Sequence, residues 1–303
     1  MRCRIISIFS IPLKSLHDAY EIRRRILSLL HKHKPGKTLK VIVGGAGPNG
    51  TEIAAELAAT VDAAVRRGLL KEGAMSVVLL DAAPSVLMML PKRLRQCAER
   101  QLQHIGVKLV LGRVLSSVNG THVLVANNPG QGTPASEPSG MPYDVCIWSG
   151  GITMSDVVRA LPFAHDPKGR LPVDGALRIE GEDDVYAIGD CAASRNPFTH
   201  APDPQTAQVA VIQAKVVAEN IIASLTGESL KTFPYPKKWP IFVTLGGKNA
   251  CGMIGPFLVS GYLGYVLRRL IDLHYFVEVL SLPDAVQFWR RGVDVYAKNE
   301  EGE

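Results

Sequence analysis

The sequence predicts an α/β fold: a Rossmann-like nucleotide-binding domain, then a second and partial nucleotide-binding domain, then a helical C-terminal segment. Short apolar runs alternate with helix-like stretches, and a glycine-rich turn joins one such pair. From Phe233 onward the chain becomes apolar, glycine-rich and aromatic. Alternating strands and helices favour a parallel sheet with crossover helices. A chain of 303 residues, 47% of them hydrophobic, is long enough to bury a large core.

The order of elements follows from apolar spacing and from breaker residues. Residues 14–33 place apolar side chains at helical spacing among charges, and "KPGK" ends that stretch before a strand at Val41. The helix expected at 91–106 begins with a proline and ends with a glycine. A glycine also ends the long apolar helix expected at 204–227. We also expect a helix at 51–67, strands at 76–81, 107–112, 122–127, 144–151 and 185–190, and a polar loop at 127–140.

The stretch "VIVGGAGPNGTEIAAELAA" carries the first functional signal. Gly45, Gly47 and Gly50 have the GxGxxG spacing, and they lie between an apolar strand and a helix. We expect Gly45 to allow a tight turn, Gly47 to let the backbone approach a pyrophosphate, and Gly50 to let the helix pack closely. The helix N-terminus favours the negative phosphates. Asp81, at the end of the next strand, is expected to bind the ribose hydroxyls and to favour NADH over NADPH.

Charge and cysteine content exclude several classes of protein. Residues 1–40 carry ten Lys/Arg and two acids, but they lack interleaved aromatic residues, so we expect no nucleic-acid partner. A solvated helix face and attraction to an anionic membrane surface both remain explanations of this charge. The five scattered cysteines show no CxxC and no metal-ligand spacing. We therefore expect no metal, no disulfide framework and a reducing compartment, and the N-terminus shows no signal peptide.

Two later phrases, "DVCIWSGG" and "VYAIGDCA", resemble those of the two-dinucleotide flavoprotein oxidoreductases. Within that superfamily the chain resembles the type II NADH dehydrogenases, which are single-subunit NADH:quinone oxidoreductases. The resemblance extends to "GGAGPNGTEIAAELA", "GRLPVDGALRIEGEDDVYAIGDCA", "PQTAQVAVIQA" and "FPYPKKWPIFVTLGGKNA", and it covers nearly all of the chain. It implies FAD and NADH as cofactors, hydride transfer from NADH to the flavin, and electron transfer to a quinone.

The resemblance also implies roles for individual residues. Glu52 matches an acid near the nicotinamide and flavin, and Gln208 a residue on the flavin edge and quinone side, with Gln213 a weaker second. These two, Glu52 and Gln208, are the expected catalytic residues. The residues expected to bind the cofactors are Gly45, Gly47, Gly50, Asp81, Gly150, Gly151, Gly189, Asp190, Ala207 and Gln208. Helix capping by Glu52 or Asp190, and simple exposure of Gln208, are the structural alternatives.

One feature of the resembled family is missing, because no flavin GxGxxG precedes Lys40. The expected division is an N-terminal helix (1–37), an NADH-binding domain (38–152), the second half of an FAD-binding domain (153–227) and a C-terminal segment (228–303). Three expectations follow from the missing half. The chain is a fragment of a longer protein, a separately encoded half completes it, or it binds NAD without electron transfer. A homodimer or a missing-half partner is the expected assembly.

The C-terminal segment contains 19 residues without charge, from Asn249 to Leu267. Four glycines and Pro256 make this stretch a poor spanning helix. We favour an amphipathic helix pair that lies on a membrane surface, with a spanning helix or ordinary packing as alternatives. The resemblance then places the protein on a bioenergetic membrane: the cytoplasmic face of a bacterial inner membrane, or the mitochondrial inner membrane.

Overall fold

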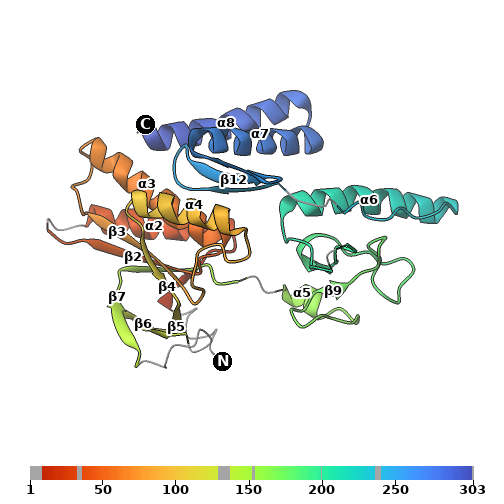
Figure 1. The fold of residues 1–303 in the computed structure, drawn as a ribbon, viewed down its shortest axis with the longest axis horizontal. Coiled ribbons are helices and arrows are strands. Elements are labelled where there is room, and N and C mark those ends of the chain that lie inside the picture. The colour runs from red at the N-terminus through yellow and green to blue at the C-terminus, as the bar shows by residue number, and fades with distance from the viewer. Residues whose placement is uncertain are drawn as a thin grey trace. The chain divides into compact units, whose positions relative to one another are not determined.

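A computed structural model describes residues 9–32, 36–128, 137–151, 154–198, 200–235 and 240–301. The chain forms two compact units (Figure 1). The first unit contains residues 1–151 together with residues 240–303, and the second contains residues 152–239. The C-terminal segment therefore belongs with the region that carries the glycine-rich turn, although the second unit separates them in sequence.

A five-stranded parallel sheet forms the centre of the first unit, as the alternation of strands and helices predicts. Its strands are, in spatial order, β1 (Ile11–Pro12), β8 (Val145–Trp148), β2 (Leu39–Gly44), β3 (Met75–Asp81) and β4 (Lys108–Leu111). The direction of the connections changes between β2 and β8, since β3 and β4 lie on one side of β2 and β8 lies on the other. In open α/β sheets, ligands bind outside the carboxyl ends of the strands at such a switch point.

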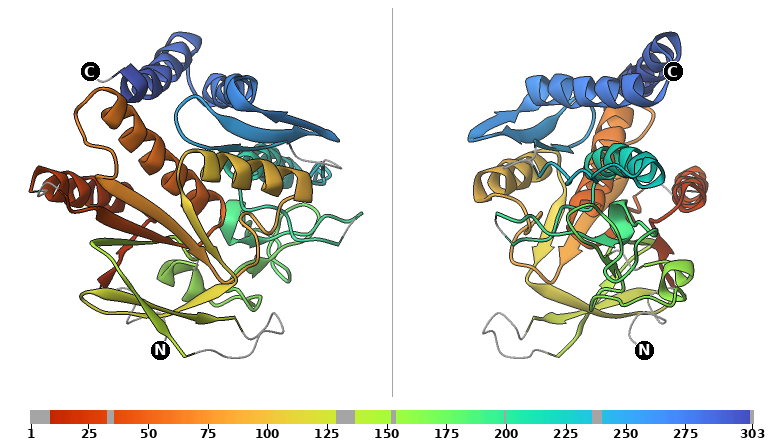
Figure 2. Two further views of the ribbon diagram at one scale, coloured as in Figure 1. Left: turned by 60° about the vertical axis from the view of Figure 1, so that its left-hand side comes forward. Right: turned by 90° about the vertical axis from the view of Figure 1, so that its right-hand side faces the viewer.

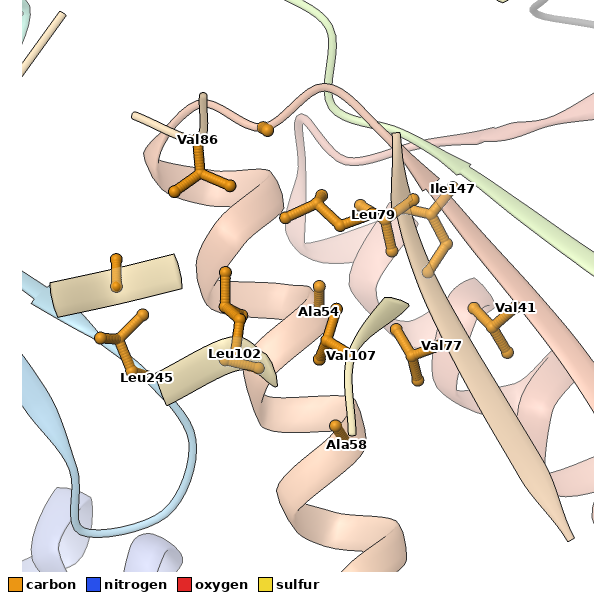
Figure 3. Packing of buried hydrophobic residues seen from close by; sticks show 14 of the residues in the cluster. Val41, Ala54, Ala58, Val77, Leu79, Val86, Leu102, Val107, Ile147 and Leu245 are labelled. Atoms are coloured by element: carbon orange, nitrogen blue, oxygen red, sulfur yellow. The ribbon is translucent and has the colours of Figure 1, made fainter. Parts of the chain in front are cut away.

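Three helices share one core with this sheet: α2 (Leu16–His31), α3 (Pro48–Arg66) and α4 (Lys92–His104). Alternate strand residues such as Val41, Leu79 and Ile147 pack against helix residues that include Ala54 and Leu102 (Figure 3). The expected helices at 14–33, 51–67 and 91–106 are confirmed, with α3 beginning earlier, at Pro48.

The opposite face of the parallel sheet is covered by a second, antiparallel sheet (Figure 2). It contains β5 (Arg113–Val118), β6 (His122–Asn127) and β7 (Ser139–Pro142). Ile42, Val78 and Leu80 alternate with the residues on the helix side and pack against Val123 and Val125 of β6. The sequence predicts β6 at its observed bounds but not β5 or β7. The middle of the loop expected at 127–140, residues 129–136, lies outside the described residues.

The C-terminal segment adds a small antiparallel sheet and two helices to the first unit. They are β11 (Ile241–Thr244), β12 (Ala250–Ile254), β13 (Phe257–Ser260), α7 (Gly261–Val279) and α8 (Leu282–Glu301). The expected helix pair is thus present, but most of the uncharged stretch 249–267 is a β-hairpin, which corrects that part of the prediction. Figure 1 shows α7 and α8 along this sheet.

A disulfide joins the C-terminal segment to α4, and it corrects the expectation that the chain carries no disulfide framework. Cys97 on α4 bonds to Cys251 on β12, 154 residues away. Both residues are buried. Neither spacing nor a motif marks this pair in the sequence, because the two partners meet only in the folded chain.

The second unit has little sheet. It contains α5 (Asp156–Arg159), a parallel pair of two-residue strands, β9 (Leu171–Pro172) and β10 (Ala192–Ala193), and α6 (Ala207–Thr226). Gly227 ends α6 in the left-handed conformation at φ +75°, as predicted. The strand expected at 185–190 is wrong, since Tyr186 makes only an isolated bridge to Arg178 and a 3₁₀ turn follows at Gly189–Cys191.

Within the described residues, α6 is the helix whose length and composition would suffice to cross a membrane. About a third of its apolar window is buried, however, and Val209, Val216 and Val217 pack in the core of the second unit. A core helix passes the same test of length and composition. The membrane contact expected from the sequence involves the C-terminal helices rather than α6, and it stays a prediction.

Candidate functional site

The glycine turn lies at the switch point of the parallel sheet. Gly45 has φ +105°, and a Cβ built on it would lie 2.8 Å from the carbonyl carbon and oxygen of Ser149. A Cβ on Gly50 would lie 1.8 Å from the Gly45 carbonyl oxygen. The turn after β2, the first turn of α3 and the loop after β8 therefore meet at distances that only glycine allows. Fully buried Ala54 continues this close packing one helical turn later.

The N-terminus of α3 is open next to this turn. Gly47 is the N-cap residue, no side chain caps the helix, and Pro48 takes a position that needs no N–H acceptor. A Cβ built on Gly47 would have no heavy atom within 4 Å. Free backbone N–H groups and the helix dipole therefore point at open space, which fits a pyrophosphate.

Asp81 lies at the carboxyl end of β3, next to the glycine turn. Its Oδ2 accepts a hydrogen bond from the Ala46 N–H at 2.5 Å, and its Oδ1 accepts one from the Ala83 N–H at 2.7 Å. The carboxylate thus holds the turn in place, a role that the sequence did not predict. Each carboxylate oxygen has a second acceptor site, so these bonds leave capacity for ribose hydroxyls.

The loop after β8 carries Gly150 and Gly151 to the same edge of the sheet. A Cβ on Gly150 would lie 2.3 Å from Trp148 Cζ2, and a Cβ on Gly44 would lie 2.8 Å from Trp148 Cε3. The Trp148 ring thus packs against both glycines and makes them necessary. Sequence reasoning missed this role of Trp148. The signal that indicates it is a bulky tryptophan placed two residues before a pair of glycines.

An open cleft of about 480 Å³ lies beside the start of α3. Its lining residues are Leu13, Lys14, Ser15, Leu16, Asn49, Glu52, Ile53, Glu56 and Thr244. Leu13 follows the carboxyl end of β1, so this cleft opens at the edge where the glycine turn lies. Glu52 Oε1 accepts a hydrogen bond from the Thr244 N–H at 3.0 Å, and Glu56 Oε2 accepts one from the Gly247 N–H at 3.2 Å.

In the second unit, a chain of buried hydrogen bonds holds the loop of Gly189 and Asp190. The Gly189 N–H donates to Gln213 Oε1 at 2.7 Å, and Gln213 Nε2 donates to Ser194 Oγ at 3.1 Å. Ser194 Oγ in turn donates to Asp203 Oδ2 at 2.7 Å. Gln213 is only 1% exposed, so this residue serves the loop through buried bonds.

The other residues expected beside a flavin are exposed on this unit. Asp190 is exposed, and its carbonyl oxygen accepts a hydrogen bond from Gln205 Nε2 at 2.9 Å. Ala207 and Gln208 occupy the exposed first turn of α6, which Thr206 caps. The structure thus brings Gly189, Asp190 and the start of α6 together, and their roles toward a flavin remain a prediction.

Replacing Gln213 by methionine is expected to lower the free energy of unfolding by about 2–3 kcal/mol. At similar side-chain volume, the variant leaves the half-buried Gly189 N–H without its acceptor and removes the donor to the buried Ser194 Oγ. Urea denaturation of the full chain measures the loss. Gln208→Met is the matched control, because Gln208 is exposed on the same helix. Equal stability of the two variants would contradict the role given to Gln213.

Burial raises the pKa of Asp203, with the Ser194 hydrogen bond opposing this effect. The native state therefore holds a proton at Asp203 more tightly than the unfolded chain does. Stability should consequently fall as the pH rises from the unfolded pKa, about 3.9, through the native pKa. Asp203→Asn retains an acceptor for Ser194 and should remove this contribution, which urea denaturation at a series of pH values would measure. If stability depends on pH in the same way in Asp203→Asn and wild type, the contribution assigned to Asp203 is wrong.

Comparison with known proteins supports the resemblance found in the sequence. Residues 11–214 match the family of pyridine nucleotide-disulphide oxidoreductases. The chain is 30% identical over 285 residues to the type II NADH:quinone oxidoreductase of Mycobacterium tuberculosis, covering 89% of this chain and 59% of that protein. It is 27% identical over 274 residues to a demethylphylloquinone reductase of Synechocystis, covering 88% of this chain and 61% of that protein.

The fold also matches a solved structure. NDH2 from Plasmodium falciparum, solved in complex with NADH, superposes with a TM-score of 0.76 at 15% sequence identity. The match covers 97% of this chain and 73% of that one. The chain spans about three fifths of the length of the curated relatives named above. The expected resemblance to type II NADH dehydrogenases is confirmed, and the chain belongs to the pyridine nucleotide-disulphide oxidoreductase family.

Proposed function

We propose that this chain binds NADH at the switch point of its parallel sheet and acts in a flavin-dependent NADH:quinone oxidoreductase. The observation that carries the proposal is the contact of Gly45 with both Gly50 and the Ser149 backbone. This contact brings an uncapped helix N-terminus and the loop after β8 to one edge of the sheet. Relatives named as type II NADH:quinone oxidoreductases support the reaction.

The residues of the first unit would hold NADH as follows. The pyrophosphate lies over Gly47, where the N–H groups at the start of α3 are free to donate. Asp81 accepts from the ribose hydroxyls and repels a 2′-phosphate, which favours NADH. The nicotinamide lies toward Gly150 and Gly151, with Glu52 in the adjacent cleft. The open cleft and the glycine contacts fit these assignments.

The second unit would contribute to a flavin site. Gln213 accepts from the Gly189 N–H and Gln205 donates to the Asp190 carbonyl oxygen. Both bonds involve the backbone, so the exposed Asp190 side chain stays available for the ribityl chain. Ala207 and Gln208 face solvent at the start of α6, where we place the flavin edge and the quinone side. FAD, when bound, supplies the hydride and electron chemistry, and the protein supplies placement and electrostatics.

The C-terminal helices would bring the protein to a membrane surface. Exposed apolar residues gather on α7 and α8, including Tyr262, Leu263, Leu282 and Phe288. The Arg291 guanidinium lies 5.9 Å from the centre of the Phe288 ring, a combination suited to the headgroup level. We place the protein on the surface of a bioenergetic membrane, bacterial or mitochondrial, because its electron acceptor is a lipid-soluble quinone.

Binding of NADH and NADPH to the purified full chain tests the proposal, together with its visible absorption. We expect flavin absorption and a clear preference for NADH. Asp81→Asn removes the charge and keeps one of the two acceptor oxygens that hold the turn, so the preference should fall about tenfold. Asp62→Asn, an exposed acid on α3, is the control. A chain that binds neither flavin nor NADH would overturn the proposal, and unchanged selectivity would remove Asp81 from its role.

A further inference from the structure

Two carboxylates on α3 tie the nucleotide-binding region to the C-terminal segment. Glu52 and Glu56 lie one helical turn apart, so their side chains leave the same face of α3. Each accepts a hydrogen bond from a backbone N–H of the chain near β11, Glu52 from Thr244 and Glu56 from Gly247. The partners are 192 and 191 residues apart in sequence, so these contacts depend on the docking of the C-terminal segment.

The turn after β11 is shaped to make this docking close. Gly246 has φ +84°, and a Cβ built on it would lie 2.7 Å from the Ala55 carbonyl oxygen and 2.8 Å from Ala59 Cβ. Leu245, beside it, is fully buried in the core that α3 and α4 share with the parallel sheet (Figure 3). The Thr244 N–H is therefore held at a fixed place relative to Glu52.

Glu52 and Thr244 also line the same cleft, together with Asn49 from the first turn of α3. A backbone N–H that donates to a carboxylate restricts the rotation of that side chain, because a charge-assisted hydrogen bond is stronger than a neutral one. With one oxygen occupied by Thr244, the carboxylate has a defined orientation at the edge where the nicotinamide is placed.

We propose that Thr244 is a positioning residue for NADH, acting through the Glu52 carboxylate. The C-terminal segment is then a structural part of the nucleotide site as well as the part that reaches the membrane. This inference rests on the proposed NADH site and adds to it a contribution from β11. It acts through the backbone, so the identity of the side chain at position 244 gives no sign of it.

A double-mutant cycle on NADH affinity tests the inference. Thr244→Pro removes the N–H, and Thr244→Val keeps the N–H and a similar shape, so the comparison of the two isolates the hydrogen bond. β11 is an edge strand, where proline is tolerated. We expect Thr244→Pro to bind NADH about five- to tenfold more weakly than Thr244→Val. In a Glu52→Ala background the two should bind equally. The readout is the NADH dissociation constant of the full chain.

Two outcomes would overturn the inference. Equal affinity of the Pro and Val variants with Glu52 present would show that the N–H does not matter. If Thr244→Pro weakens NADH binding equally with Glu52 present and in the Glu52→Ala background, the effect is a general structural one and does not act through the carboxylate. If thermal melting shows that Thr244→Pro does not fold, Gly246→Ala replaces it in the same cycle, because its Cβ would push the turn away from α3. Failure of the wild-type chain to bind NADH would instead overturn the proposed function, and this inference with it.

Discussion

Gly50→Ala is expected to abolish NADH binding and to lower the free energy of unfolding by about 3 kcal/mol or more. The added Cβ is fixed directly to the α3 backbone and would lie 1.8 Å from the Gly45 carbonyl oxygen, a backbone atom, so neither can move alone. The first turn of α3 would have to shift from β2 and carry its N–H groups away from the phosphate position. Urea denaturation and NADH titration of the same preparation measure the two losses.

Gly47→Ala, at the same turn, tests NADH binding without disturbing the fold. A Cβ there meets nothing within 4 Å, and φ is −70°, so alanine fits without strain. We expect wild-type stability but NADH affinity reduced at least tenfold, because the methyl group occupies the space of the pyrophosphate. If Gly47→Ala binds NADH as tightly as wild type, the pyrophosphate does not lie over Gly47. If Gly50→Ala has wild-type stability and wild-type NADH affinity, the close contact between Gly50 and Gly45 does not exist as described.

The parts of the fold that the sequence predicts are those whose signal is local. β2 and β3 are buried on both faces, so they appear as continuous apolar runs followed by a glycine turn or an acid. The stretch "VYAIG" has the same composition as a strand, yet Gly189 adopts φ +65° and its N–H bonds to Gln213 instead of a neighbouring strand. Apolar composition therefore does not decide whether a strand partner exists.

The C-terminal hairpin also shows that composition does not reveal which strands pair. Its glycines and lack of charge suggested a membrane-facing segment, whereas one of those glycines serves packing between strands. A Cβ on Gly252 would lie 2.2 Å from Phe242 Cδ1, so the glycine makes room for an aromatic ring on the facing strand. A sequence read along one chain does not show which residue lies opposite, so the pairing stays hidden.

Within the candidate site, the sequence predicts the residues but not what holds them. The spacing of Gly45, Gly47 and Gly50 specifies a turn, because glycine is required there for steric reasons. The partners of Glu52 and Gly189 are Thr244 and Gln213, which are distant in sequence. Thr244 contributes a backbone group that every residue except proline carries, so no sequence pattern could mark it.

The disulfide between Cys97 and Cys251 should be the largest single contribution to stability. In the chain-entropy account, closing a loop of 154 residues destabilises the unfolded state by about 5 kcal/mol. Reduction should therefore lower the midpoint of urea denaturation strongly in the wild-type chain. In Cys251→Ala, reduction should change nothing, because the bridge is already absent. Cys191→Ala, which removes a free cysteine, should respond to reduction as wild type does.

Thiol titration decides whether the bridge forms at all. In the denatured and unreduced protein, three of the five cysteines should react, because two are joined. Burial raises the pKa of Cys146 to about 12, so in the native protein this thiol should stay unreactive at neutral pH and cannot be mistaken for the bridge. Five reactive thiols after denaturation would contradict the disulfide and restore the expectation of unpaired cysteines. Three reactive thiols would show that α4 is joined covalently to β12, so that α7 and α8 stay attached to the parallel sheet's helices even when local contacts open.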